Sequence, residues 1–110
     1  MRFDSSELLG RSDQAERFLR QLSNRYRLMA LCLLSGEELS VGQLNERIPL
    51  SQSALSQHLT VLRNAGVVAT RRQAQTIYYR LTDPKLVGVL VSLCELSESM
   101  NDAVKGEQKR

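Results

Sequence analysis

The spacing of apolar residues along the chain predicts five helices. Over residues 13–22, apolar side chains recur every three or four positions, as in an amphipathic helix, with Ser12 or Asp13 as its N-cap. The same spacing and the capping residues predict further helices over residues 25–34, 41–48, 52–65 and 85–101. Gly36 is expected to end the second helix in the left-handed conformation, and Gly66 to close the fourth. Residues 1–12 and 102–110 lack this pattern, so we expect a flexible arm and a flexible tail.

Two runs of strand-forming residues lie between the last two predicted helices. They cover residues 67–72 and 76–81, and in the second run Ile77, Tyr79 and Leu81 alternate with polar side chains. The polar link over residues 73–75 makes them a hairpin. Three helices, a recognition-type helix, a two-stranded wing and a closing helix are typical of the winged helix-turn-helix fold. We therefore predict one mainly α domain over residues 13–101, with a small β-hairpin.

The fourth predicted helix has an unusual outer face. Leu55, Leu59 and Leu62 form one apolar stripe, and short hydroxyl and carboxamide side chains occupy much of the remainder. An ordinary solvated helix face is rich in Glu and Lys, whereas hydroxyls and carboxamides donate and accept hydrogen bonds at base edges and phosphates. This face predicts a DNA recognition helix. The alternative is a polar surface helix that binds nothing.

Charge is distributed unevenly along the chain, although the net charge is only +3. No acidic residue lies between Glu46 and Asp83, while this interval contains five arginines: Arg47, Arg63, Arg71, Arg72 and Arg80. Such a block favours a polyanionic partner, because neutralising phosphates releases condensed counterions. A merely solvated basic surface would ordinarily include carboxylates.

The last predicted helix carries two neighbouring apolar rows. They are Leu86, Leu90 and Leu93, and Val87, Val91 and Cys94. This is more apolar surface than the edge of a small domain needs, so we predict a homodimer formed by the first and last helices. The alternative is a helix that only completes the monomer core.

Several classes of protein are disfavoured by what the sequence lacks. At 110 residues the chain fits one domain. It has no apolar run near the roughly 20 residues of a membrane span and no signal-peptide pattern at its start, so we expect a cytoplasmic protein that binds no membrane. No glycine-rich phosphate loop or carboxylate pair accompanies the single histidine, His58. We therefore expect neither an enzyme nor a cofactor.

Several segments together resemble the ArsR family of bacterial transcriptional regulators. They are residues 27–34, 39–44, 50–59, 62–68 and 71–81. The resemblance spans about residues 14–97 and implies a homodimeric repressor that binds an imperfect palindrome in double-stranded DNA and leaves it when an effector binds. Two recognition helices would then enter successive major grooves about 34 Å apart.

Individual side chains can be assigned roles on this basis. We expect Ser53, Ser56 and Gln57 at base edges, and Gln52, His58 and Arg63 at phosphates. On the hairpin, the residues expected at the flanking backbone or minor groove are Arg71, Arg72, Gln73 and Gln75.

The metal sites of the family have no match here. The segment corresponding to its thiolate site, residues 40–43, contains no sulfur, and the last helix contains no histidine. The chain is instead similar to the metal-free branch, which includes persulfide-sensing repressors of the BigR, SqrR and YgaV type, HlyU and NolR. The sulfide sensors pair a cysteine in the second helix with one in the last helix. Cys32 matches the first, whereas Cys94 lies one turn before the expected position, near Glu98.

The sequence leaves the role of the two cysteines open. A disulfide or polysulfide formed by a reactive sulfur species or another oxidant could join Cys32 to Cys94, and a direct disulfide needs α-carbons within about 7 Å. Alternatively, both serve as small buried apolar residues in an effector-independent NolR-like repressor or anti-silencer. Two more remote alternatives are a winged-helix module that binds an acidic protein partner and a thiol enzyme.

Overall fold

The computed structural model describes residues 4–108 and has five helices and three short strands in this range. The helices are α1 Ser5–Leu22, α2 Arg25–Leu34, α3 Val41–Asn45, α4 Gln52–Asn64 and α5 Lys85–Gln108. The strands are β1 Leu39–Ser40, β2 Val68–Gln73 and β3 Thr76–Leu81. This order confirms the predicted winged helix-turn-helix fold, mainly helical with a small hairpin.

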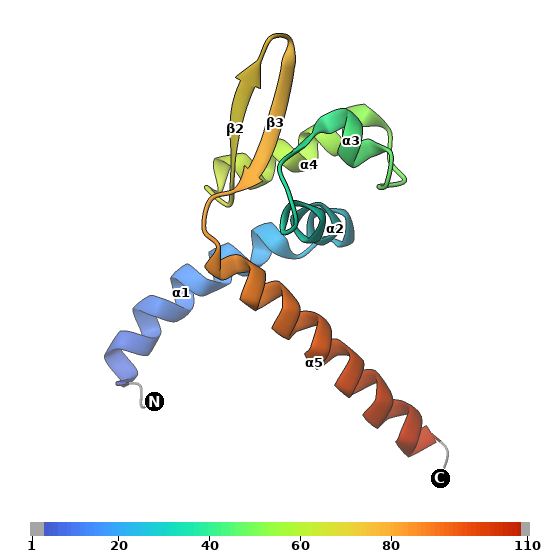
Figure 1. Cartoon of the computed structure of the whole chain (residues 1–110). Helices are drawn as coiled ribbons and strands as arrows, with labels where there is room; N and C mark the ends of the chain where they lie inside the picture. Colours follow the sequence, from blue (N-terminus) through green and yellow to red (C-terminus); the bar gives the residue numbers. More distant parts are fainter. Residues whose placement is uncertain (1–3, 109–110) are drawn as a thin grey trace.

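The helices α2, α3 and α4 form the centre of the molecule. The hairpin β2–β3 projects from one side of this centre, and α1 and α5 extend away from it on the other side in two different directions (Figure 1). The molecule is consequently elongated, with extents of 54 × 42 × 22 Å. None of the helices within residues 4–108 combines the length and the apolar composition that crossing a bilayer needs.

Side-chain caps explain where the central helices begin. The Asn24 side chain accepts hydrogen bonds from the backbone N–H groups of Tyr26 and Arg27, at 2.9 and 3.2 Å, at the start of α2. Ser40 and Gln43 form a capping box at α3, in which each side chain accepts from the backbone N–H of the other residue. The predicted bounds of α2 are confirmed, and α3 ends three residues earlier than predicted.

The two outer helices are longer than predicted. The first helix begins at Ser5 rather than Asp13, with Asp4 as its N-cap, so the prediction of an arm without regular structure is wrong for residues 5–12. Likewise, α5 continues to Gln108, so the predicted tail is helical over residues 102–108. Residues 1–3 and 109–110 lie outside the described range.

The two glycines expected to end helices differ in conformation. Gly66 has a φ of +77° directly after α4, which is the left-handed conformation predicted for it. Gly36 has no positive φ, so that prediction is wrong. The turn after α2 instead keeps right-handed helical geometry at Ser35, whose hydroxyl donates to the Leu31 carbonyl oxygen at 2.9 Å.

The sheet has the order β1-β3-β2, and both pairs of strands are antiparallel. In the hairpin Val68 pairs with Leu81 and Gln73 pairs with Thr76, which leaves Ala74 and Gln75 as the turn. The two-residue strand β1, which was not predicted, pairs Leu39 with Tyr79. The base of the hairpin is thereby joined to the chain that leads into α3.

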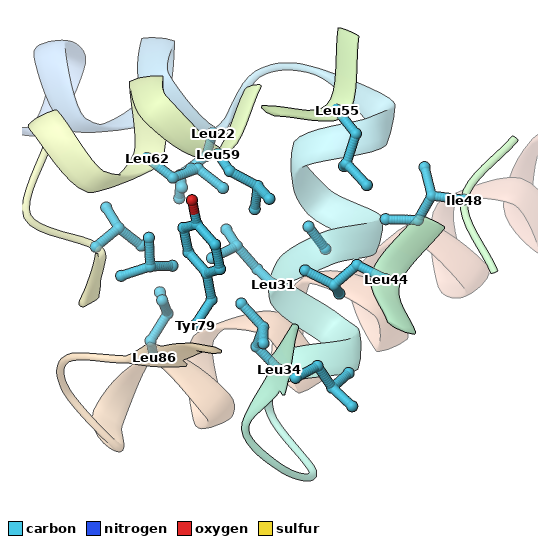
Figure 2. Packing of buried hydrophobic residues seen from close by; sticks show 14 of the residues in the cluster. Leu22, Leu31, Leu34, Leu44, Ile48, Leu55, Leu59, Leu62, Tyr79 and Leu86 are labelled. Carbon is cyan, nitrogen blue, oxygen red and sulfur yellow. The ribbon is translucent and has the colours of Figure 1, made fainter. Parts of the chain in front are cut away.

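The core is entirely apolar apart from the Tyr79 hydroxyl, and in the described range no charged residue is buried. Figure 2 shows Tyr79 among leucines of several elements, with Leu31 of α2 and Leu59 of α4 close to its ring. The largest side chains with less than 2% of their surface exposed are Leu31, Leu44, Ile48, Leu55, Leu59 and Leu62. Three of these six belong to α4, so one face of this helix is packed into the core.

Candidate nucleic-acid interface

The helix α4 lies between α3 and the base of the hairpin (Figure 1). Its N-cap is Ser51, whose hydroxyl accepts from the Ala54 backbone N–H at 3.1 Å. The first turn contains no acidic residue. The partial positive charge at this end of the helix therefore remains available to an anion such as a phosphate.

The turn that leads into α4 is fixed by one amide side chain. Asn45 Nδ2 donates to the carbonyl oxygens of Ile48, at 3.4 Å, and Leu50, at 2.8 Å. Ile48 is 1% exposed and anchors the same turn in the core. The angle between α3 and α4 is thus set by both packing and hydrogen bonds.

Two adjacent rows of polar side chains lie on the side of α4 that faces away from the core. The spacing of an α-helix puts Ser53, Gln57, Thr60 and Asn64 in one row, and all four are exposed. Beside it lies a second row of three residues: Gln52, Ser56 and Arg63. Ser56 is half-buried, while Gln52 and Arg63 are exposed.

Sequence reasoning missed Thr60 and Asn64, although the helical spacing from Ser53 and Gln57 could have identified them. The Thr60 hydroxyl donates to the Ser56 carbonyl oxygen at 2.9 Å. Its oxygen can still accept a hydrogen bond, and its methyl group is suited to contact with a thymine methyl.

His58 does not share this surface. It is half-buried and lies about 100° around the helix from Gln57. Its Nδ1 accepts a hydrogen bond from Arg27 Nε of α2 at 3.2 Å, and its ring centroid lies 6.1 Å from that of Tyr26. The structure therefore brings His58 toward α2, apart from the other residues predicted to contact DNA.

The hairpin presents Arg71 and Arg72 on opposite faces, because successive residues of a strand alternate. Arg71 Nε donates to Glu38 Oε1 at 2.5 Å, and its guanidinium carbon lies 4.6 Å from the centroid of the Tyr78 ring. It also donates to Gln73 Oε1 at 3.0 Å. The arginine is therefore held by an acidic residue from outside the acid-free block, an interaction that the sequence did not predict.

Arg72, Gln75 and the exposed Arg80 take part in no side-chain hydrogen bond or ion pair recorded among residues 4–108. Of the arginines on the hairpin, Arg72 lies nearer the tip than Arg80. Arg72 is thus the cation best able to extend from the tip toward a polyanion.

The two cysteines lie together where α2 and α5 meet. Both line a hollow of about 240 Å³, together with residues such as Val91 and Glu98. Both thiols are free and exposed in the single chain, so the fold of one protomer does not by itself bury them. Glu98, the position where the family resemblance implies a cysteine, borders the same hollow.

The surroundings of Cys32 disfavour its thiolate. Although the residue is partly exposed, burial of the sulfur raises the pKa of the Cys32 thiol above its ordinary value, and Cys94 raises it further through charge and hydrogen bonding. The Cys94 sulfur is therefore near enough to affect the ionisation of Cys32. The offset of Cys94 along the sequence does not separate it from Cys32.

Large apolar side chains are exposed on α1 and α5. The residues on α1 are Leu8, Leu9, Phe18 and Leu19, and those on α5 are Val89, Val91, Leu93, Leu96, Met100 and Val104. Leu9 is 79% exposed and Leu96 is 57% exposed. Within the single chain, each of these residues keeps between 37% and 79% of its surface exposed.

Metal ligands are not clustered in the described range. No group of three or more His, Cys, Asp or Glu side chains among these residues is arranged to hold a metal ion.

The chain is similar to known regulators over most of its length. The family model for bacterial regulatory proteins of the arsR family matches residues 24–70. The chain is 44% identical over 90 residues to the transcriptional activator HlyU of Vibrio cholerae, a match that covers 82% of this chain and 83% of HlyU. It is also 44% identical over 88 residues to the nodulation protein NolR of Rhizobium meliloti, covering 80% of this chain and 72% of NolR. The crystal structure of the transcriptional repressor BigR from Xylella fastidiosa matches with a TM-score of 0.77 at 37% identity, covering 86% of this chain and 96% of that one.

Proposed function

Because the chain belongs to the ArsR family of bacterial transcriptional regulators, we propose that it represses transcription by binding a palindromic operator as a homodimer in the cytoplasm. It is a DNA-binding regulator and not an enzyme. The observation that carries the proposal is the exposed row of hydroxyl and carboxamide side chains on α4, beside a hairpin that bears Arg72. This row can read base edges while the hairpin binds the backbone.

The proposed contacts divide into two classes. Ser53 and Gln57 bind base edges in the major groove. Ser56 and Thr60 contact base edges beside them. Gln52 and Arg63 bind phosphates, and so do the polar residues of the hairpin, Arg72, Gln73 and Gln75. Arg71 acts mainly by orienting the hairpin, because Glu38 and Tyr78 already hold its guanidinium.

The proposed dimer uses α1 and α5 of both protomers. The helices α1 and α5 extend away from the centre of the molecule and expose ten large apolar side chains between them (Figure 1). A monomer rarely exposes so much apolar surface. A twofold axis through these helices would cover them and would also pair two copies of α4 for a palindrome.

Substitution of Gln57 and Arg72 tests the DNA contacts. A randomised duplex library first identifies the preferred site. Gln57→Ala is then expected to cost about 1 to 3 kcal/mol on that site and to relax the preference, whereas Arg72→Ala weakens all duplexes alike and reduces the salt slope by about one.

Gln14→Ala and Arg11→Ala are the matched controls, since both residues are exposed on α1. Equal losses on the preferred and random duplexes for Gln57→Ala would exclude a base-reading role. A wild-type protein with no preference among duplexes at physiological salt would favour a protein-interaction module instead.

We also propose that oxidised sulfur species regulate the protein through Cys32 and Cys94. One thiolate attacks the terminal sulfur of a polysulfide, which breaks an S–S bond, releases the shortened polysulfide and leaves a cysteine persulfide. The thiolate of the other cysteine then attacks the inner sulfur of the persulfide and displaces hydrosulfide, which leaves a disulfide between α2 and α5. The proximity of the two thiols in one hollow supports this proposal. The covalent link would alter the packing of α5, and thus the spacing of the two copies of α4.

Mass spectrometry after polysulfide treatment, combined with operator titration, tests this regulation. For the wild type we expect a product in which Cys32 and Cys94 are linked, and a lower affinity for the operator after treatment. For Cys94→Ser we expect the same operator affinity before and after treatment. If both thiols remain unmodified and affinity is unchanged, the cysteines have only a packing role, as in an effector-independent repressor or anti-silencer.

A further inference from the structure

One arginine side chain of α2 connects this helix to α1 and to α4, the proposed reading helix. Arg27 lies in the first turn of α2 and is half-buried. Its Nε donates to His58 Nδ1 on α4, and its NH1 donates to the carbonyl oxygen of Gln21 in the last turn of α1, both at 3.2 Å. The end of α1 and the middle of α4 are therefore joined through a single guanidinium.

The base of this connection is itself fixed. Asn24 Oδ1 accepts from the backbone N–H groups of Tyr26 and Arg27, which holds the first turn of α2 in place. The Tyr26 ring lies 6.1 Å from the His58 ring, with 34° between their planes. The planar guanidinium can thus hold the imidazole in one orientation.

The hydrogen bond determines the tautomer of the neutral His58 ring. An arginine N–H can only donate, so Nδ1 must be unprotonated and the proton of the neutral ring must lie on Nε2. The ionisable groups close to the ring come from α2: Arg27, Tyr26 and, against the Tyr26 ring, Arg25. On α4 itself, the residues three and four positions away, Ala54, Leu55, Val61 and Leu62, are uncharged, and α1 contributes the amide Gln21. None of these groups is a carboxylate that would stabilise an imidazolium.

We propose that Arg27 and His58 are positioning residues that fix the orientation of α4 against α1 and α2, and that protonation of His58 releases this hold. Protonation of Nδ1 would replace the hydrogen bond with two cationic groups facing each other. Because Gln57 precedes His58 directly, a rotation of α4 displaces the side chains of the outer row. The inference rests on the proposed function in one respect, namely that α4 reads DNA.

Substitution of Arg27 separates positioning from direct DNA contact. Arg27→Met retains the apolar stem and removes the donors. Both hydrogen bonds of Arg27 are lost, but only the bond to His58 holds α4. We therefore expect roughly a three- to tenfold loss of affinity for the preferred duplex, in line with the loss of that one bond. The control is Arg20→Met, which loses the same charge on the neighbouring α1. Arg27→Met and Arg20→Met should have the same affinity for random DNA and the same salt slope. A salt slope reduced by about one would identify Arg27 as a phosphate ligand, and an unchanged preference for the duplex would also overturn the proposal.

Substitution of His58 tests the proton dependence and does not depend on Arg27→Met folding. In His58→Asn, Oδ1 can take the place of Nδ1 as an acceptor that does not titrate. The ratio of preferred to random affinity is measured over a series from about pH 8 to pH 5.5 and should fall for the wild type toward the acid end. It should stay nearly constant for His58→Asn, and a parallel fall in both proteins would overturn the proposal.

Nitrogen NMR of the free protein tests the same contact without DNA. The neutral ring should be the Nε2–H tautomer in the wild type and lose this strict preference in Arg27→Met. A ring that carries its proton on Nδ1 would refute the hydrogen bond. If the wild type shows no preference among duplexes, the proposed function fails, while this measurement still decides whether the contact exists.

Discussion

Replacing Leu96 by alanine is expected to weaken the proposed dimer about a hundredfold. The substitution removes three carbon atoms. Transferring one such carbon atom from water into an interface stabilises the dimer by about 0.8 kcal/mol, so complete transfer of all three would contribute about 2.4 kcal/mol. Since 57% of Leu96 is exposed in the single chain, the share available to a partner is about 1.4 kcal/mol per protomer. A twofold dimer contains the position twice, which gives about 2.7 kcal/mol.

Sedimentation equilibrium over a concentration series measures this effect directly. Ile77→Ala is the matched control, because Ile77 is an exposed apolar residue on the hairpin, away from α1 and α5. The helical content of dilute Leu96→Ala should equal that of the wild type, since Leu96 is not part of the core. If the dimer dissociation constant for Leu96→Ala stays within about twofold of the wild type, the assignment of α5 to the interface is refuted.

Two further predictions concern single residues. Iodoacetamide should alkylate Cys32 only at higher pH than an ordinary thiol, because burial and then Cys94 raise its pKa; Cys94→Ser should move the midpoint of the rate profile to lower pH, and an unmoved midpoint would contradict the coupling. Gly66→Ala should lower the free energy of unfolding by about 1 kcal/mol at a φ of +77°, while Ala74→Gly should raise it by about 0.5 kcal/mol at a φ of +55°. Urea denaturation measures both, and changes of the same sign would argue against these backbone conformations.

The parts of the fold that the sequence predicted correctly are those in which local pattern and burial agree. The helix α4 has an apolar stripe, a serine cap and a glycine stop, and its predicted bounds differ from the structure by one residue at the C-terminal end. Its outer row could be read from the same periodicity. The hairpin also followed from local signals, since strand-forming residues flank a short polar link.

The sequence did not predict those parts of the structure that depend on contacts between residues distant in the chain, or helical segments without a buried face. Residues 5–12 show no periodicity because this part of α1 is exposed along its whole length. The strand β1 has only two residues and exists through its pairing with β3. The contacts of His58 with Arg27, and of Arg71 with Glu38, join residues more than 30 positions apart, so no local pattern could indicate them.

The two sides of α4 have consequences for how such a regulator can change during evolution. Leu55, Leu59 and Leu62 face the core, whereas Ser53 and Gln57 are exposed. Substitutions in the outer row therefore leave the packed interior untouched and cost little stability. A duplicated copy of this gene could acquire a new operator by changing a few exposed residues of one helix, while the rest of the protein continued to fold as before.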